Sequence, residues 1–162
     1  MAFRERIPDF KIFSIVEKEE IVEKLRVQFG IERLDGLIVA RGTERLFLYQ
    51  GDLSPKDISD LENMRMNIER CGIYFAKIHR GDVRLSIEGV YALKDQIKLN
   101  IYDLTESEAQ KWMEGSELNV SCGMRGFVVM KYKNYFLGCG KASAEKIGNF
   151  VPKNRRLKIK QN

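Results

Sequence analysis

From Gly89 onward the chain carries short strand-like runs separated by turn residues and no long helical pattern. The single helix expected in this half is short, because Thr105 and Glu108 form a capping box and Gly115 can end it. Many short strands with turn signals between them are typical of a small closed barrel. We therefore predict a small β-barrel over residues 89–162. Its strand-like runs lie at 96–104, 117–120, 126–133 and 135–140.

The first half instead alternates helical and strand-like segments, which is typical of an α+β fold. Apolar residues on one face predict a first helix over 14–29, which Gly30 can close. The N-cap Ser54 and its capping-box partner Asp57 predict the start of a second helix. No Pro/Gly/Ser-rich linker separates the halves, so an α+β domain over residues 1–88 is expected to pack rigidly against the barrel. The other expected elements are the rest of the second helix, to residue 68, and strands at 36–41, 44–49, 71–79 and 83–88.

The composition is that of a folding chain, with 44% hydrophobic residues in a length of 162. No run of ~18 apolar residues is present, so we expect no membrane span and no membrane partner. Residues 1–13 mix charged and apolar side chains and lack the apolar stretch of a secretory signal. A cytoplasmic protein is therefore expected.

Side chains that could carry chemistry are sparse. The three cysteines, Cys71, Cys122 and Cys139, are far apart in sequence, and the only histidine is His79. Zinc sites need four clustered ligands, so we expect no metal site and interpret the thiols as reduced and mostly buried. Nothing in the sequence brings His79 beside a cysteine, so no catalytic residue and no cofactor are predicted.

The run Gly138-Cys139-Gly140-Lys141 invites comparison with phosphate-binding loops. A P-loop needs a glycine five residues before its Gly-Lys pair and a Ser or Thr after it. Here Tyr135 and Ala142 occupy those positions, so the run is not a P-loop. Its two glycines at a strand end could still let an RNA backbone approach exposed amides beside Lys141.

Charge is distributed unevenly along the chain. Residues 1–121 hold 18 Lys and Arg against 22 Asp and Glu, whereas residues 122–162 hold ten against one. Such asymmetry indicates a polyanionic partner for the basic part, with a solvated tail of no function as the alternative. The cations predicted to contact phosphate are Arg125, Lys131, Lys133, Lys141, Lys146, Lys153, Arg155 and Arg156.

Two aromatic residues each allow two interpretations. Phe150 lies in the basic segment and could stack on a base, or pack in a core with Ile147 and Val151. Trp112, the only tryptophan, lies on the expected short helix and could be a core residue or a stacking surface. Core packing is favoured at both positions.

The segment from Gly138 to Leu157 has a Gly-x-Gly-Lys run followed by an isoleucine, an Asn, a Pro-Lys pair and an Arg. These residues are Gly138, Gly140, Lys141, Ile147, Asn149, Pro152, Lys153 and Arg156. In them the segment resembles the C-terminal PUA-like domain of the Sun/Fmu family of rRNA cytosine methyltransferases. The order of the runs GIYFAKI, RLSIEGV and GFVVM is also similar to small ribosome-biogenesis factors of archaea and eukaryotes, in which an α/β pre-PUA domain precedes a PUA barrel.

These resemblances imply an RNA-binding protein of rRNA or ribosome maturation. Its partners would be structured RNA, in particular rRNA, and a ribosome-assembly or RNA-modification protein. None of the prolines Pro8, Pro55 and Pro152 precedes a cysteine, so the catalytic Pro-Cys of the methyltransferases is missing and no enzyme activity is expected. The alternative is a non-catalytic RNA-targeting subunit of a separate RNA-modifying enzyme, such as a cytosine methyltransferase.

Overall fold

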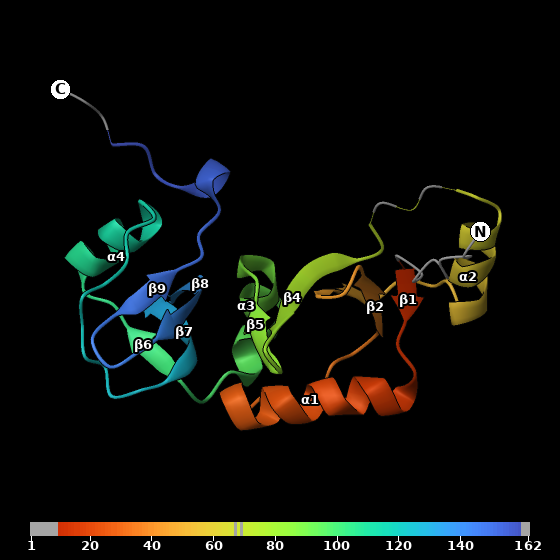
Figure 1. The fold of residues 1–162 in the computed structure, drawn as a ribbon, viewed down its shortest axis with the longest axis horizontal. Coiled ribbons are helices and arrows are strands. Elements are labelled where there is room, and N and C mark those ends of the chain that lie inside the picture. Colours follow the sequence, from red (N-terminus) through yellow and green to blue (C-terminus); the bar gives the residue numbers. More distant parts are fainter. Residues whose placement is uncertain (1–9, 67, 69, 160–162) are drawn as a thin grey trace, which may run out of the picture.

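The computed structural model describes residues 10–66, 68 and 70–159 and shows an α+β fold, as predicted, with two sheets (Figure 1). The first sheet is antiparallel, in the order β1 (Phe10–Ile12), β2 (Leu37–Arg41), β3 (Arg45–Tyr49), β4 (Ile73–His79) and β5 (Asp82–Leu85). The second has the order β6 (Ile101–Asp103), β7 (Gly126–Tyr132), β8 (Tyr135–Ala142) and β9 (Ile147–Asn149). The helices are α1 (Ile15–Phe29), α2 (Pro55–Asn63), α3 (Ile87–Leu93) and α4 (Glu106–Met113), with 3-10 turns η1 (Lys94–Gln96) and η2 (Lys153–Arg155).

Helix α1 begins and ends where the sequence predicts. The Ser14 hydroxyl accepts a hydrogen bond from the backbone N–H of Glu17 at 3.2 Å, and Gly30 follows the helix with a φ of 75°. Its buried face, which includes Leu25 and Phe29, belongs to the main hydrophobic core. None of the helices in the described part of the chain is long and apolar enough to cross a membrane.

Helix α2 begins with the predicted capping box but is shorter than predicted. The Ser54 hydroxyl accepts from the backbone N–H of Asp57 at 3.1 Å. The helix ends at Asn63 rather than at residue 68, because Arg65 has a φ of 59° that an α-helix cannot contain.

The second sheet is open, whereas the sequence predicts a closed barrel. β6 pairs with β7 in parallel, β7 and β8 form the predicted hairpin, and β9 lies on the far edge. Within the described residues, the expected strand at 117–120 is reduced to one bridge between Leu118 and Ile147. Helix α4 packs the fully buried Trp112 against this sheet. A helix therefore completes the core where the prediction placed further strand pairs.

The segment VRLSIE, predicted as a strand over 83–88, turns into helix α3 after Ser86. The Ser86 hydroxyl accepts from the N–H of Gly89 at 2.9 Å and donates to the carbonyl of Tyr74 at 2.6 Å. Gly89 packs so closely on β4 that a Cβ at this position would overlap the carbonyl oxygen of Phe75. The boundary that the sequence places near residue 89 therefore falls inside α3.

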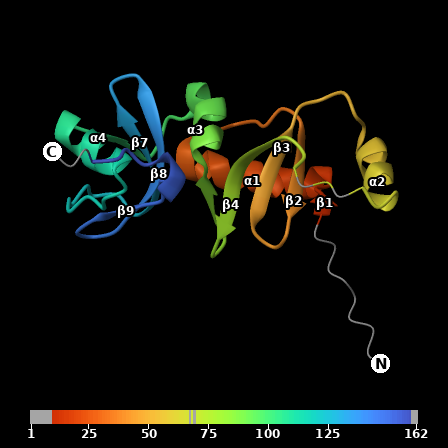
Figure 2. The ribbon, with the colours of Figure 1, turned by 90° about the horizontal axis from the view of Figure 1, so that it is seen from above.

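Helix α3 lies between the two sheets, against β4 on one side and β8 on the other (Figures 1 and 2). One hydrophobic cluster runs through this contact and joins Phe75 and Leu85 of the first sheet to Phe127 and Val129 of the second. A separate cluster around Trp112 fills the far side of the second sheet. The two sheets thus share a core, which holds them in a fixed relation.

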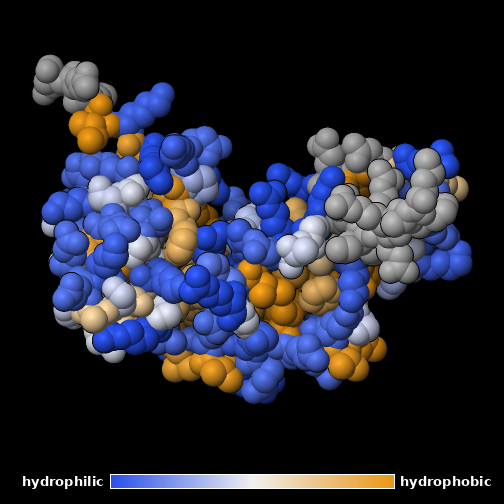
Figure 3. All heavy atoms as spheres, in the orientation of Figure 1, coloured by the Kyte–Doolittle hydropathy of each residue, from blue (hydrophilic) through white to orange (hydrophobic). Residues whose placement is uncertain are grey.

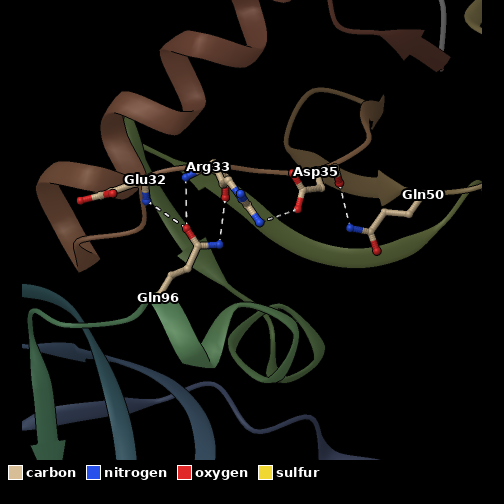
Figure 4. Close-up of polar contacts among 5 residues, drawn as sticks. All are labelled: Glu32, Arg33, Asp35, Gln50 and Gln96. Carbon is tan, nitrogen blue, oxygen red and sulfur yellow. Dashed lines mark hydrogen bonds and ion pairs between the residues drawn. The ribbon is translucent and has the colours of Figure 1, made fainter.

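A hydrogen-bonded loop ties the segment after α3 to the end of α1 (Figure 4). The side-chain oxygen of Gln96 accepts from the backbone N–H groups of Glu32 and Arg33 at 3.2 and 3.1 Å, and its nitrogen donates to the Arg33 carbonyl at 3.1 Å. Beyond β3, Gln50 donates to the carbonyl of Asp35 at 2.8 Å. The Arg33 and Asp35 side chains form an ion pair at 3.4 Å. These exposed contacts therefore fasten the loop between α1 and β2 to the segment after α3 and to the end of β3.

Candidate nucleic-acid interface

The predicted cations are spread over the second sheet and the segment that follows it. Hydrophilic residues cover most of the visible face of this half of the molecule, at the left in Figure 3. Lys131 and Arg156 are partly buried. The exposed ones are Arg125, Lys133, Lys141, Lys146, Lys153 and Arg155.

Lys131 and Lys141 lie on the face of the second sheet that is directed toward the first. In the β7–β8 register, Lys131 is opposite Phe136 and Lys141 is opposite Phe127. Each ammonium nitrogen lies 5.6 Å from the centroid of the opposite ring, within the range of cation–π attraction. Phe127 belongs to the shared core and Phe136 packs against it. These two cations therefore border the contact between the sheets.

Lys133 and Lys153 are the most available of the predicted cations. Lys133 is in the β7–β8 turn, with its ammonium 5.1 Å from the Tyr132 ring centroid. Lys153 is exposed in η2, and in the described residues neither lysine forms an ion pair. Arg125 is also exposed, but its guanidinium donates to two backbone carbonyls, at 3.0 and 3.4 Å.

Lys146 and Arg156 also make contacts within the protein. Lys146 pairs with Glu117 at 2.8 Å, with both side chains about half exposed, so a polyanion can compete for this lysine. Arg156 is different: its Nε donates to the carbonyl of Val151 at 3.0 Å. Its side chain also fills the space beside Gly115 that a Cβ would need. Arg156 therefore supports the fold of the segment that carries the other cations.

A groove of about 340 Å³ lies between the two sheets, and we call it the inter-sheet groove. Parts of β4, β5 and α3 line one side, and β8 and residues 150–155 line the other. Among the described residues that line it, the charged ones are three arginines and one acid, Arg70, Arg84, Arg155 and Glu88. Arg155 and Glu88 form an ion pair, with 43% and 46% of their side chains exposed. The volume lies in the range of ligand pockets in proteins, and the charge favours an anion.

An aromatic residue and a guanidinium meet in this groove. Phe150 is 39% exposed, and the Arg84 guanidinium carbon lies 4.3 Å from its ring centroid. The centroid of the Phe127 ring lies 6.2 Å from that of Phe150. The His79 ring packs edge-on against Phe127, with the two ring centroids 6.0 Å apart. The core position that the sequence favours for Phe150 is thus only half right, because one part of the ring packs and another faces the groove.

Trp112 is a core residue. It is fully buried, and its indole N–H donates to the carbonyl of Leu137 at 2.9 Å. Gly140 serves this packing, since a Cβ there would lie 2.7 Å from the Trp112 ring and 2.6 Å from Ile147. Gly138 and Gly140 are both buried. The expectation that this glycine pair exposes amides to an RNA backbone is therefore wrong.

Arg70 and Arg84 come from the first half of the chain and were not among the predicted site residues. Acids and bases nearly balance before residue 122, so the net charge of that segment concealed its individual arginines. The strand alternation of the run VRLSIE places Arg84 between the buried Val83 and Leu85, and so indicated an outward side chain. Only the three-dimensional contact between β5 and residue 150 brings that side chain to the basic half.

The three cysteines are free thiols, of which Cys139 is buried and Cys71 and Cys122 are partly buried. Burial raises the pKa of the Cys139 thiol to about 12, and burial also raises the pKa of Cys71. In the part of the chain that the structure describes, no group of His, Cys, Asp and Glu is placed to hold a metal ion. His79 is half-buried against Phe127.

Comparison with known proteins gives one family match. Residues 99–157 match the family model described as "Methyltransferase RsmF PUA domain". The chain is 24% identical over 139 residues to the ribosomal RNA small subunit methyltransferase F of Psychromonas ingrahamii, a match that covers 85% of this chain and 28% of that protein. The protein of the same name in Vibrio parahaemolyticus is 28% identical over 143 residues, which is 85% of this chain and 29% of the relative.

The chain spans less than a third of the length of these relatives. The family match confirms that the second half resembles the PUA-like domain of an rRNA methyltransferase. The matches to the relatives are more than twice as long as residues 99–157, so they extend into the first half. The similarity to two-domain ribosome-biogenesis factors stays a prediction.

Proposed function

We propose that this chain binds structured RNA in rRNA maturation, through the basic surface of residues 89–162, and that it does not catalyse a reaction itself. Residues 1–88 orient this surface. The observation that carries the proposal is the match of residues 99–157 to the PUA domain of a ribosomal RNA methyltransferase. The ten basic residues against one acid after residue 121 supply the charge that such binding needs.

The availability of the cations supports phosphate binding. Like charges gathered on one part of a protein repel one another and weaken the compact state, and a polyanion relieves that repulsion. Lys133, Lys141 and Lys153 are exposed on this surface, and within the described residues no carboxylate pairs with them. RNA binding therefore relieves the repulsion by which these lysines lower the stability of the free protein.

The chemistry of the cysteine and proline residues supports a binding role. The thiolate is the nucleophilic form of cysteine, and the buried Cys139 has a pKa of about 12. None of the prolines precedes a cysteine, so the Pro-Cys that the resemblance associates with methyl transfer has no counterpart in this sequence.

The experiment is a salt titration of binding to a structured rRNA fragment. The variant Lys133→Ala/Lys141→Ala/Lys153→Ala removes three exposed charges. Affinity should fall about tenfold or more, and the slope of log affinity against log salt should flatten by about two to three units. The matched control is Lys24→Ala/Arg45→Ala/Lys56→Ala, which removes three exposed charges from the first half of the chain and should change affinity by less than about twofold.

Two outcomes would reject the proposal. One is wild-type protein whose RNA affinity is insensitive to salt. The other is a control triple variant that weakens binding as much as the test variant does. Either result would mean that the basic surface of the second half is not the RNA site.

A second candidate function is that of a non-catalytic RNA-targeting subunit for a separate methyltransferase. The observation that favours it is the length of the relatives, which are methyltransferases more than three times as long as the matched segment. Purification from cells distinguishes the two functions. A stoichiometric modifying enzyme supports the second, and ribosomal precursors without such an enzyme support the first.

A further inference from the structure

We propose that the inter-sheet groove holds one unpaired RNA nucleotide, whose base stacks on the Arg84–Phe150 pair and whose phosphate meets Arg155 and Arg70. The inference rests on the proposed RNA binding and adds to it a specific subsite. It also gives the first half of the chain a direct part in binding, because Arg70 and Arg84 both precede residue 89.

Phe150 offers a nucleobase a partly exposed aromatic ring, in addition to its packing against the protein. Phe150 lines the groove, and 39% of its surface is exposed. The Phe127 ring packs against it, with the two ring centroids 6.2 Å apart and an interplanar angle of 56°. A ring that is already held in place loses little conformational entropy when a base stacks on it.

Arg84 extends the stacking surface. Its guanidinium carbon lies 4.3 Å from the Phe150 ring centroid, so the planar guanidinium covers part of the ring. A guanidinium plane carries a nucleobase by the same stacking as an aromatic ring. Arg84 comes from β5, whose neighbours Val83 and Leu85 are buried in the shared core, and this anchors the strand that presents it.

The groove also supplies cations for the phosphate. Arg155 is paired with Glu88, but both side chains are more than two-fifths exposed, so the pair contributes little and a phosphate can take the place of Glu88. Arg70 lies exposed at the same groove. Among the described residues that line the groove, three arginines outnumber one acid, which suits a ligand that combines an aromatic base with an anionic phosphate.

The shape of the groove selects an unpaired nucleotide. Walls from both sheets enclose a volume of about 340 Å³, which suits a small ligand and excludes a duplex. Bases in single-stranded loops and bulges can turn outward and stack on protein side chains, whereas bases in a helix stack on one another. Duplex segments of the same RNA would contact the exposed lysines outside the groove.

The test uses two RNAs of equal charge, a short single strand with one 2-aminopurine and a fully paired duplex. The wild-type protein should quench 2-aminopurine fluorescence as the base stacks. Phe150→Leu keeps an apolar side chain and the net charge, and should lower single-strand affinity about tenfold with loss of quenching. Its affinity for the duplex should stay within about twofold of the wild-type value. Its slope of log affinity against log salt should stay within about one unit of the wild-type slope.

Arg84→Lys is the companion variant, because it keeps the charge and removes the planar guanidinium. It should weaken single-strand binding about threefold or more while leaving duplex binding unchanged. Phe150→Tyr, which retains the ring, should bind and quench as the wild type does. An unchanged single-strand affinity and quenching in Phe150→Leu would overturn the subsite, while salt-dependent duplex binding would still support the basic surface.

A crosslinking measurement on the wild-type protein tests the subsite without relying on any variant to fold. RNA carrying a photoreactive uridine in a loop should crosslink to Phe150 or to the residues beside it. Crosslinks confined to the β7–β8 hairpin would overturn the subsite and would leave the proposed RNA surface in place. Absence of any RNA crosslink together with salt-insensitive binding would reject both.

Discussion

The side-chain amide of Asn149 donates a hydrogen bond to the carbonyl of Trp112 at 2.8 Å, and so connects β9 to the end of α4. The same nitrogen donates to the carbonyl of Ser116 at 2.9 Å, while the side-chain oxygen accepts from the N–H of Val151 at 2.7 Å. All three bonds involve backbone groups that a folded chain must satisfy. Asn149 therefore fixes the point from which the segment carrying Phe150 departs.

Replacing this amide should destabilise the fold. Asn149→Ala removes three hydrogen bonds to backbone groups, so we expect the free energy of unfolding to fall by about 1–3 kcal/mol. Urea denaturation measures this change. The control is Asn154→Ala, an exposed position in the same segment whose replacement should cost less than about 0.5 kcal/mol. Equal costs for the two variants would contradict the structural role of Asn149.

Arg156 should contribute to the stability of the fold, whereas Lys153 should contribute to RNA binding. Arg156→Ala removes the hydrogen bond to the Val151 carbonyl and the packing beside Gly115, and should lower the free energy of unfolding by about 1–2 kcal/mol. Lys153→Ala should leave stability unchanged and instead reduce the salt dependence of RNA binding by about one unit. If thermal melts show the reverse order of stability, the assignment of Arg156 is wrong.

Stability should fall steeply at alkaline pH because of Cys139. Burial raises its pKa to about 12 in the folded protein from an ordinary value of 9.0, so the folded state keeps a proton that the unfolded state releases. The contribution of this thiol is complete below pH 9 and is lost as pH rises toward 12, at about 1.4 kcal/mol per pH unit. Unfolding by urea at pH 8 and pH 10.5 under reducing conditions measures the loss.

The matched variant for that measurement is Cys139→Ala. It should be less stable than the wild type at pH 8, yet lose about 2 kcal/mol less between the two pH values. Tyr102, whose pKa burial and a hydrogen bond to Glu108 raise to about 12, contributes a loss of the same sign in both proteins. Equal alkaline losses in the two proteins would show that Cys139 is not the source.

Removing the acid of the inter-sheet groove should strengthen RNA binding. Glu88→Gln frees Arg155 from its ion pair and removes the only carboxylate that lines the groove in the described residues. An exposed pair of this kind is worth up to about 1 kcal/mol, so we expect affinity for single-stranded RNA to rise about two- to fivefold. A fall in affinity, measured by the same fluorescence titration, would mean that Glu88 orients Arg155 for binding.

Local hydrogen-bonding signals made several elements predictable from sequence. The capping boxes at Ser54 and Thr105 start α2 and α4 as expected, and Gly30 ends α1. The β7–β8 hairpin was predictable because Lys133 and Asn134 form a short polar turn between apolar runs. Each of these signals depends on residues that are neighbours in the sequence.

Elements that depend on distant contacts were not predictable in the same way. Helix α3 has a glycine, Gly89, where a helix disfavours one, and the reason is the backbone of β4 packed against it. The parallel pairing of β6 with β7 and the covering of the sheet by Trp112 likewise have no local signature. The sequence therefore predicted a closed barrel. In the structure the sheet is open, and helix α4 covers the part of the core that the sheet leaves uncovered.

The candidate site was predictable in part for the same reason. Net charge along the chain indicated the basic half and, within it, exposed cations such as Lys141 and Lys153. Net charge could not indicate that Arg156 stabilises the fold, because this role depends on the hydrogen bond from Arg156 to the Val151 carbonyl. Nor could it join Arg84 to Phe150, which are far apart in the sequence and meet only across the two sheets.

The core that passes between the sheets also decides how this chain can be divided. Phe127, Val129 and Cys139 turn their side chains into a cluster completed by Phe75 and Leu85. A fragment limited to residues 99–157 would present the first three to water as an uncovered apolar face, with a tendency to self-associate. The whole chain should accordingly melt in a single transition, and neither half should be obtainable as a well-behaved protein on its own.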